Sequence, residues 1–231
     1  MALIDCKSLT KKYGKKLALN NIDLSLEGGR IVGLAGPNGS GKTTLIKLLQ
    51  HLLTPTDGEI LIDGMKPGKD TKAIVSYLPD RDFLPDWMKL SALLDYYGKF
   101  YRDFDREKAE QLIDQLSLDR SMSMKKMSKG TREKVQLVLC VSRNAKVYLL
   151  DEPIAGVDPA ARDYIIRTII DNYNENALVL ISTHLISDVE AVLDEVIFLK
   201  YGEVFLHENA DDLRSRTQMS IDGYFREVFK C

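Results

Sequence analysis

Cysteines are few in this sequence, and long apolar runs are missing from it. The three cysteines, Cys6, Cys140 and Cys231, are widely separated and form no C-x-x-C pair. This spacing argues against a disulfide framework or a thiolate metal site and favours buried thiols in a reducing compartment. No apolar run approaches the roughly 20 residues that a membrane-spanning helix needs, so we expect no membrane crossing. The first residues show no cationic segment followed by an apolar core, so we also expect no signal peptide.

An excess of charge of one sign is also missing. The 32 Lys and Arg residues nearly balance 34 Asp and Glu residues, for a net charge of -2. A near-neutral chain gives no support to nucleic-acid binding through a bulk basic field, so no nucleic-acid partner is expected. Hydrophobic residues make up 45% of the 231 residues and charged residues 29%. Those values are typical of a globular protein long enough to bury one large core.

Short strand-like stretches alternate with turn signals in the first sixty residues. The stretches 2–10, 16–29 and 58–64 are expected to form antiparallel strands and hairpins. Residues 30–36, RIVGLAG, form a near-continuous apolar run, which is typical of a strand buried on both faces. A glycine-rich loop follows, and then a helical pattern over residues 43–53 that ends before a Thr-Pro pair.

The middle of the chain has a helical pattern instead. Ala109, Leu112, Ile113 and Leu116 recur at the spacing of one helix face. We therefore predict a helical subdomain inserted at about residues 86–143.

Strands and helices alternate again after this insertion. This alternation predicts a largely parallel sheet with helices on its faces. Strands are expected at residues 146–153, 177–184 and 196–207, and helices at 132–144, 159–176 and 186–195. A short helical tail is expected at about 209–231, and we interpret residues 1–231 as a single domain.

A glycine-rich loop matches the pattern G-x-x-x-x-G-K-[ST], which predicts nucleotide binding. Glycines let successive backbone N–H groups point at a polyphosphate, and the following helix N-terminus favours an anion. Lys42 is expected to contact the β- and γ-phosphates, and Thr43 to bind Mg²⁺. Kinases, GTPases and transport ATPases all share this loop, so the loop alone leaves the reaction open. The predicted ATP-binding residues of the loop are Gly36, Pro37, Asn38, Gly39, Ser40, Gly41, Lys42, Thr43 and Thr44.

Two adjacent acids end a second apolar run. Residues 147–150 lead directly into Asp151 and Glu152. In P-loop proteins a second strand brings an acid beside the Mg²⁺, and Asp151 stands where such an acid belongs. Glu152 could then act as a general base or polarise the attacking water. The alternative is a pair of solvated acids in an ordinary turn.

The order of these motifs resembles the nucleotide-binding subunit of ATP-binding cassette (ABC) transporters along nearly the whole chain. Tyr13 lies where that family places an aromatic residue that stacks on adenine. Residues 127–131, MSKGT, match its L-S-G-G-Q signature in outline, residues 154–158 resemble its D-loop, and residues 182–184 its switch-histidine motif. The resemblance implies an α/β P-loop NTPase fold with a mainly parallel central sheet, an N-terminal antiparallel β subdomain and an inserted α-helical subdomain.

The resemblance also implies an ATPase that uses ATP and Mg²⁺ as cofactors. Its catalytic residues would be Glu152, Lys42 and His184, the last as a donor to the γ-phosphate. A lone histidine after an apolar strand is usually only a strand end, and only the motif order favours a role for His184. Asp158 would communicate between the two sites of a head-to-tail dimer with a second, identical or different, nucleotide-binding subunit. The signature residues that would face the ATP of the partner subunit are Ser128, Lys129, Gly130 and Thr131.

The sequence departs from the family pattern in two places. Lys129 replaces the first glycine of the signature, and Thr131 replaces its glutamine. Asp80 stands where the Q-loop glutamine is expected. Aspartate is shorter than glutamine and charged, so we expect Asp80 to contact the metal through a water. The predicted metal site therefore consists of Thr43, Asp151 and Asp80.

The resemblance implies an integral membrane permease as a further partner. Apolar side chains cluster just after Asp80, at Phe83, Leu84, Pro85, Trp87 and Met88. They would either receive a helix of the permease or form the core of the helical insertion, and the sequence favours neither. The function implied is an exporter-like ATPase subunit, cytoplasmic and held on the inner face of the cell membrane through the permease. The alternative is a soluble ABC ATPase that acts on nucleic acid or ribosomes.

Overall fold

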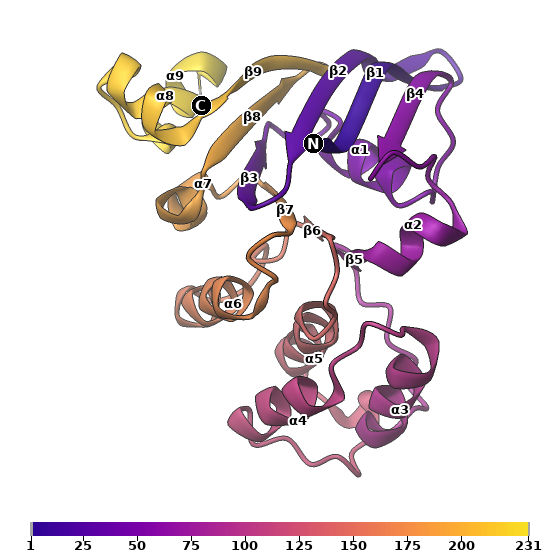
Figure 1. The fold of residues 1–231 in the computed structure, drawn as a ribbon. Coiled ribbons are helices and arrows are strands. Elements are labelled where there is room, and N and C mark those ends of the chain that lie inside the picture. The colour runs from indigo at the N-terminus through magenta and orange to yellow at the C-terminus, as the bar shows by residue number, and fades with distance from the viewer. Residues whose placement is uncertain (1, 231) are drawn as a thin grey trace.

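The computed structural model describes residues 2–230, without the side chains of residues 159–161. A three-stranded antiparallel sheet is formed by the N-terminal part of the chain (Figure 1). Its order is β2-β1-β4, with β1 at Ala2–Tyr13, β2 at Lys16–Glu27 and β4 at Asp57–Ile62. The three strand predictions in this region are confirmed.

A six-stranded sheet forms the centre of the molecule, in the order β5-β6-β7-β3-β8-β9. All neighbouring pairs are parallel except β8 and β9, which pair antiparallel. Every residue of β6 and β7 is buried, as expected for parallel strands covered on both faces. The strands are β3 Arg30–Ala35, β5 Val75–Leu78, β6 Val147–Asp151, β7 Leu178–Thr183, β8 Glu195–Lys200 and β9 Glu203–Asn209.

The helices cover this sheet and extend beyond one end of it. Helices α3, α4 and α5 lie together at the end opposite the three-stranded sheet (Figure 1). Asp105 and Ser128 cap α4 and α5 by accepting backbone N–H groups of the first turn. The helices are α1 Lys42–Leu49, α2 Lys69–Ile74, α3 Leu90–Phe100, α4 Arg106–Gln115, α5 Lys129–Val141, α6 Pro159–Asn172, α7 Ile186–Val189, α8 Ala210–Thr217 and α9 Ile221–Phe229.

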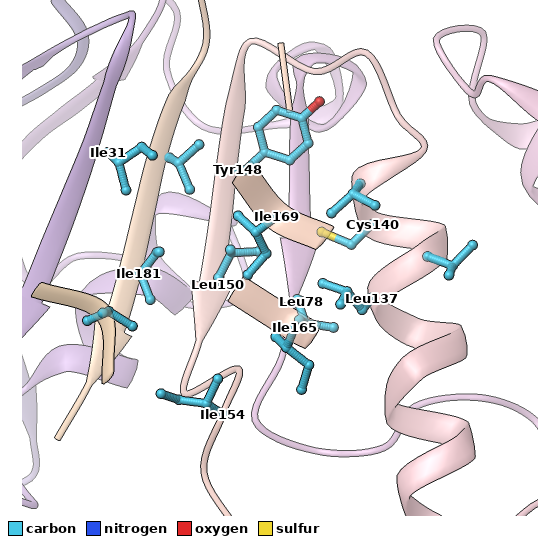
Figure 2. Packing of buried hydrophobic residues seen from close by; sticks show 14 of the residues in the cluster. Ile31, Leu78, Leu137, Cys140, Tyr148, Leu150, Ile154, Ile165, Ile169 and Ile181 are labelled. Atoms are coloured by element: carbon cyan, nitrogen blue, oxygen red, sulfur yellow. The ribbon is translucent and has the colours of Figure 1, made fainter. Parts of the chain in front are cut away.

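Two hydrophobic clusters form the core, one on each face of the central sheet. The first contains buried residues of α1, the central strands and the three-stranded sheet, so α1 is packed between the two sheets. The second joins the opposite face of the central sheet to α5 and α6 (Figure 2). There, Leu137 and Cys140 of α5 and Ile165 of α6 pack with Tyr148 and Leu150 of β6. This packing connects the helical region directly to the strand that ends at Asp151.

Three helix predictions were too long. The helix expected over residues 43–53 ends at Leu49, because His51 adopts a left-handed φ of 54° and the N–H groups of Leu52 and Leu53 both donate to the Lys47 carbonyl. Helix α6 ends at Asn172 rather than at residue 176.

The helix expected over 186–195 stops after one turn, at Val189, and a 3₁₀ turn follows at Glu190–Val192. Helix α2 and strand β5 were missed.

Candidate nucleotide-binding site

A cavity of about 440 Å³ lies where the P-loop, the β1–β2 hairpin and the carboxyl ends of β6 and β7 meet. Most of the residues predicted to bind ATP or to act in catalysis line it. Gly36, Pro37 and Ser40 of the loop do not. The lining residues are Tyr13, Lys16, Ala18, Asn38, Gly39, Gly41, Lys42, Thr43, Thr44, Asp80, Glu152, Ala155 and His184.

Close backbone packing explains the glycines at both ends of the P-loop. A Cβ at Gly36 would lie 2.5 Å from the Leu199 carbonyl oxygen. A Cβ at Gly41 would lie 2.7 Å from the Ala18 carbonyl oxygen, and the φ of 113° at Gly41 disfavours any other residue. Because Gly41 precedes α1 and has no side chain to cap it, the first N–H groups of α1 are available to an anion.

Lys42 is held at the base of the cavity. Its ammonium donates to the Gly36 carbonyl oxygen at 2.7 Å and lies 3.5 Å from Glu152 Oε1. The side chain is almost fully buried. A desolvated cation in this position favours a phosphate group strongly, because water screens it little.

Asp151 ends β6 in full burial. Its Oδ1 accepts hydrogen bonds from Ser182 Oγ at 2.7 Å and from Thr43 Oγ1 at 3.2 Å. Burial raises the pKa of this carboxyl above its usual range, and the Ser182 hydrogen bond opposes that rise. The Oδ2 atom is buried without a hydrogen-bond partner among the described residues. A carboxylate oxygen free beside the Thr43 hydroxyl provides the oxygen ligands that Mg²⁺ prefers, so these residues fit a magnesium ion.

Glu152 joins the P-loop to the end of β7. Its Oε2 lies 2.8 Å from His184 Nδ1, and its backbone N–H donates to Ser182 Oγ at 3.0 Å. Glu152 has a left-handed φ of 53°, an unusual conformation for a residue other than glycine. Such strain is typical of functional sites, where the surrounding structure holds one residue in a fixed orientation.

Tyr13 and Asp80 line other parts of the same cavity. The Tyr13 side chain is 46% exposed, and the Lys11 ammonium lies 5.4 Å from its ring centroid. Burial is the main cause of the raised pKa of Tyr77, and the negative charges of Asp151 and then Asp80 raise it further. The Tyr77 hydroxyl lacks a hydrogen-bond partner among the described residues. Asp80 therefore adds negative charge to the region around Asp151.

The signature residues and Asp158 do not line this cavity, although Ala155 of the D-loop does. Ser128 Oγ accepts the Thr131 N–H at 3.2 Å and caps α5, and the Lys129 side chain is exposed. Outside its own helix, no described atom lies within 4 Å of the position of a Cβ at Gly130. Asp158 is exposed at the end of the loop after β6. The structure thus leaves all five predicted partner-facing residues on the surface of the same chain.

Sequence reasoning missed four residues of the site, which are Lys16, Ala18, Ala155 and Ser182. Lys16 and Ala18 line the cavity because they follow Tyr13 across the hairpin, and Ser182 holds both Asp151 and Glu152. The first two reach the cavity through the pairing of Tyr13 with Lys16, a register that the sequence pattern does not determine. Ser182 was noted only as part of a motif, although a buried hydroxyl at a strand end needs a partner.

A P-loop after a central strand, with acids at the end of a second strand, defines the class of P-loop NTPases. A family model described as "ABC transporter" matches residues 19–155, which is more than half of the chain. The chain therefore belongs to the ABC transporter family of ATP-binding proteins.

Curated relatives share this assignment over most of their length. The ABC transporter ATP-binding protein YtrB of Bacillus subtilis is 28% identical over 95% of this chain and 77% of its own. The ABC-type transporter ATP-binding protein EcsA of the same organism is 29% identical, over 100% of this chain and 98% of its own. The lipopolysaccharide export system ATP-binding protein LptB of Haemophilus influenzae is 28% identical over 100% of both chains.

Solved structures agree with the fold. An ATP-binding subunit of an ABC transporter superposes with a TM-score of 0.88 at 25% identity, covering 98% of this chain and 99% of the other. The ATP-binding cassette MJ0796, solved as a dimer with ADP and Pi, has a TM-score of 0.77 at 24% identity, over 89% and 98% of the two chains, and shares the fold. The predicted fold class is confirmed.

This chain is the ATP-binding subunit of an ABC transporter, and it is an ATPase. Among residues 2–230, no helix combines the length and the apolar content that crossing a membrane requires.

Proposed function

We propose that this chain hydrolyses ATP with Mg²⁺ in a head-to-tail dimer and drives export through a separate membrane permease. One observation carries the catalytic part. The Glu152 carboxylate lies between Lys42 Nζ, at 3.5 Å, and His184 Nδ1, at 2.8 Å, at the edge of the nucleotide cavity. A carboxylate that contacts both a phosphate-binding cation and a histidine is well placed to accept a proton from a water that attacks the terminal phosphate.

The metal would be held by Thr43 and Asp151, with Asp80 in contact through a water. A bound Mg²⁺ would neutralise the β- and γ-phosphates as charge develops on them. The buried Asp151 Oδ2, which lacks a partner in the described part of the chain, supports this assignment.

The hydrolysis step assigns one task to each nearby side chain. Glu152 accepts a proton from water while the water oxygen forms a bond to the γ-phosphorus, and the bond from that phosphorus to the bridging oxygen breaks. The products are phosphate and ADP, and Lys42 stabilises the negative charge of the β- and γ-phosphates. His184 keeps the Glu152 carboxylate directed at the water and donates to the γ-phosphate.

The second subunit, identical or different, would complete each site. Ser128, Lys129, Gly130 and Thr131 begin α5 on the surface, where free N–H groups suit the γ-phosphate of ATP bound by the partner. Asp158 would connect the two sites. Ser128→Ala should abolish ATP-dependent dimerisation of the Glu152→Gln protein, measured by light scattering.

Ser220 offers a matched control, because its Oγ caps α9 just as Ser128 caps α5. Ser220→Ala removes an equivalent cap, and it should leave the ATP-dependent dimer intact. Equal loss in both variants would mean that helix stability, and not contact with the partner's ATP, controls the dimer.

An exporter role is supported by the relatives. LptB is named for lipopolysaccharide export, and LnrL of Bacillus subtilis, 27% identical over 93% of this chain and 71% of its own, for linearmycin resistance. The chain would then work in the cytoplasm, on the inner face of the membrane. Trp87 is 78% exposed and Phe83 44% exposed beside α3, and both are available to a permease helix. Leu84 and Met88 instead pack in the hydrophobic core. Part of this segment therefore belongs to the core, and Trp87 and Phe83 are the residues proposed to contact a permease.

The test uses native membranes. Glu152→Gln protein with a photo-crosslinker at position 87 should link, with ATP present, to one polytopic membrane protein encoded with it. The same crosslinker at the exposed Tyr201, on the β8–β9 turn, should not. Exclusive recovery of ribosomal or nucleic-acid partners would favour a soluble ABC ATPase instead.

A further inference from the structure

Lys16 faces the nucleotide cavity from the β1–β2 hairpin. Tyr13 pairs directly with Lys16 across the turn, and directly paired residues place their side chains on the same face of a sheet. Ala18 follows on that face because alternate residues of a strand share a side. All three residues line the cavity, so one face of the hairpin forms one of its walls.

The same strand touches the P-loop. The Ala18 carbonyl oxygen and Leu19 Cδ2 would lie 2.7 Å and 2.6 Å from a Cβ at Gly41, the residue before α1. Lys16 is therefore two strand residues, about 6.6 Å, from the point of contact with the helix N-terminus. The flexible four-carbon stem of a lysine can cover such a distance.

Of the lysines that line the cavity, Lys16 is the one whose ammonium has no partner among the described residues and can bind a phosphate. The lysine and acidic residues that line the cavity are Lys16, Lys42, Asp80 and Glu152. Lys42 is already engaged with the Gly36 carbonyl oxygen and Glu152. Within residues 2–230, no hydrogen bond or ion pair holds the Lys16 ammonium, although it lies beside a site for a polyanion.

We infer that Lys16 binds the α-phosphate of ATP and ADP. The assignment rests on the proposed function and on the nucleotide orientation that the family resemblance implies, with adenine on Tyr13 and the β- and γ-phosphates at Lys42. Lys16 lies next to Tyr13, and the strand that carries it runs from Tyr13 towards Gly41. A cation there meets the phosphate nearest the nucleoside, which ATP and ADP share.

Isothermal titration of ATP and ADP against folded variants tests this assignment. Lys16→Ala should raise the Kd of both nucleotides by about tenfold, the usual effect of a lost charge-assisted hydrogen bond. Lys16→Arg should restore binding. Lys12→Ala and Lys15→Ala remove the same charge from the same hairpin without touching the cavity, and both should stay within about twofold of wild type.

The dependence of nucleotide binding on ionic strength provides a second test, because a purely structural role of Lys16 would not change it. Loss of one phosphate contact should make nucleotide binding by Lys16→Ala less sensitive to ionic strength than binding by the Lys12 and Lys15 variants. Lys16→Gln keeps most of the stem and should behave as Lys16→Ala does, which excludes an effect of lost packing.

Two results would overturn the inference. Kd values for Lys16→Ala within twofold of wild type would remove Lys16 from the site, and weakening of ATP alone would place its contact at the γ-phosphate. Tyr13→Ala separates this failure from failure of the proposed orientation. If Tyr13→Ala weakens binding and Lys16→Ala does not, only the role of Lys16 is wrong; if Tyr13→Ala has no effect, the orientation itself is wrong.

Discussion

The Oε2 atom of Glu152 lies 2.8 Å from Nδ1 of His184, and the backbone N–H of His184 also donates to that oxygen, at 3.3 Å. These two contacts come from one residue, 32 positions away in the sequence, and they fix the orientation of the Glu152 carboxylate. Because the ends of β6 and β7 are adjacent in the sheet, two motifs distant in sequence form one functional pair.

Loss of the His184 imidazole should reduce hydrolysis much more than binding. We expect His184→Ala to lower kcat by about 10²-fold, within the range of positioned acid–base groups, and to leave the Kd of ADP almost unchanged. Steady-state phosphate release and titration of ADP measure the two effects.

His207 provides the control, because its Nε2 lies 2.8 Å from Glu195 Oε2 in a similar pair away from the cavity. His207→Ala should leave kcat at the wild-type value. If the Glu152→Gln and His184→Ala effects simply multiply in the double variant, the two residues do not act as a unit.

Asp80 should tune the response to Mg²⁺. Its carboxylate lines the cavity and adds negative charge near Asp151, so Asp80→Asn should raise the Mg²⁺ concentration needed for half-maximal ATP binding by several-fold. Magnesium titrations at fixed ATP, read by nucleotide fluorescence, measure this shift. Asp82→Asn is a nearby control that removes the same charge outside the cavity. Unchanged magnesium dependence and unchanged turnover in Asp80→Asn would show that Asp80 has no part in the metal site.

Those parts of the site that depend on local chemistry could be predicted from sequence. Position 41 requires glycine because of its φ of 113° and its close contact with Ala18. The glycines of the P-loop therefore predict its backbone geometry directly from the sequence. The apolar run before Asp151 likewise predicts burial, since only a strand covered on both faces tolerates it.

Features that depend on register or on short elements could not be predicted. Strand β5 has four residues, too few to show a periodicity, and its place at the sheet edge depends on pairing with β6. The cavity wall at Lys16 depends on the hairpin register, which shifts several times between β1 and β2. The early end of α1 depends on the local conformation of His51.

Cys6 and Cys140 should resist alkylation in the folded protein. Burial raises the pKa of the Cys6 thiol to about 12 and that of Cys140 to about 11, so almost no thiolate exists at pH 8. Peptide mass spectrometry after iodoacetamide at pH 8 should find both unlabelled in buffer and both labelled in guanidinium. Labelling in buffer at the denatured rate would contradict their burial.

The same shifts give stability a pH dependence above neutrality. A raised thiol pKa means that the folded state holds the proton more tightly than the unfolded state does. This contribution is fully present below the ordinary pKa of 9.0 and is lost as the pH rises towards about 12. The free energy of unfolding should therefore fall from pH 8 to pH 10.5, and Cys6→Ala should reduce the slope. A slope that is equal in both proteins would assign the loss to other groups.

Arg143 should contribute more to stability than any exposed arginine. Its side chain is 3% exposed and donates to the Val75 and Ala73 carbonyl oxygens at 2.6 and 2.7 Å, and to Asp103 at 3.0 and 3.1 Å. Arg143→Ala would remove the donors to these carbonyl oxygens and leave the part-buried Asp103 carboxylate without its cation, which costs about 3 kcal/mol. Arg143→Lys should rescue little, because an ammonium cannot reproduce the planar fork of donors. Urea unfolding measures both losses.

The pair between Arg226, which is 64% exposed, and Asp222, 2.8 Å apart on α9, provides the contrast. Arg226→Ala should change the free energy of unfolding little, because the Arg226 guanidinium is exposed and water screens its pair with Asp222. Since Arg143, just after α5, donates to backbone carbonyls of α2 and of the first residue of β5, its loss should also weaken the connection between the helical region and the central sheet. Hydrogen exchange of α3 and α4 should then rise more than that of β6 and β7; uniform acceleration would mean that Arg143 stabilises the whole fold equally.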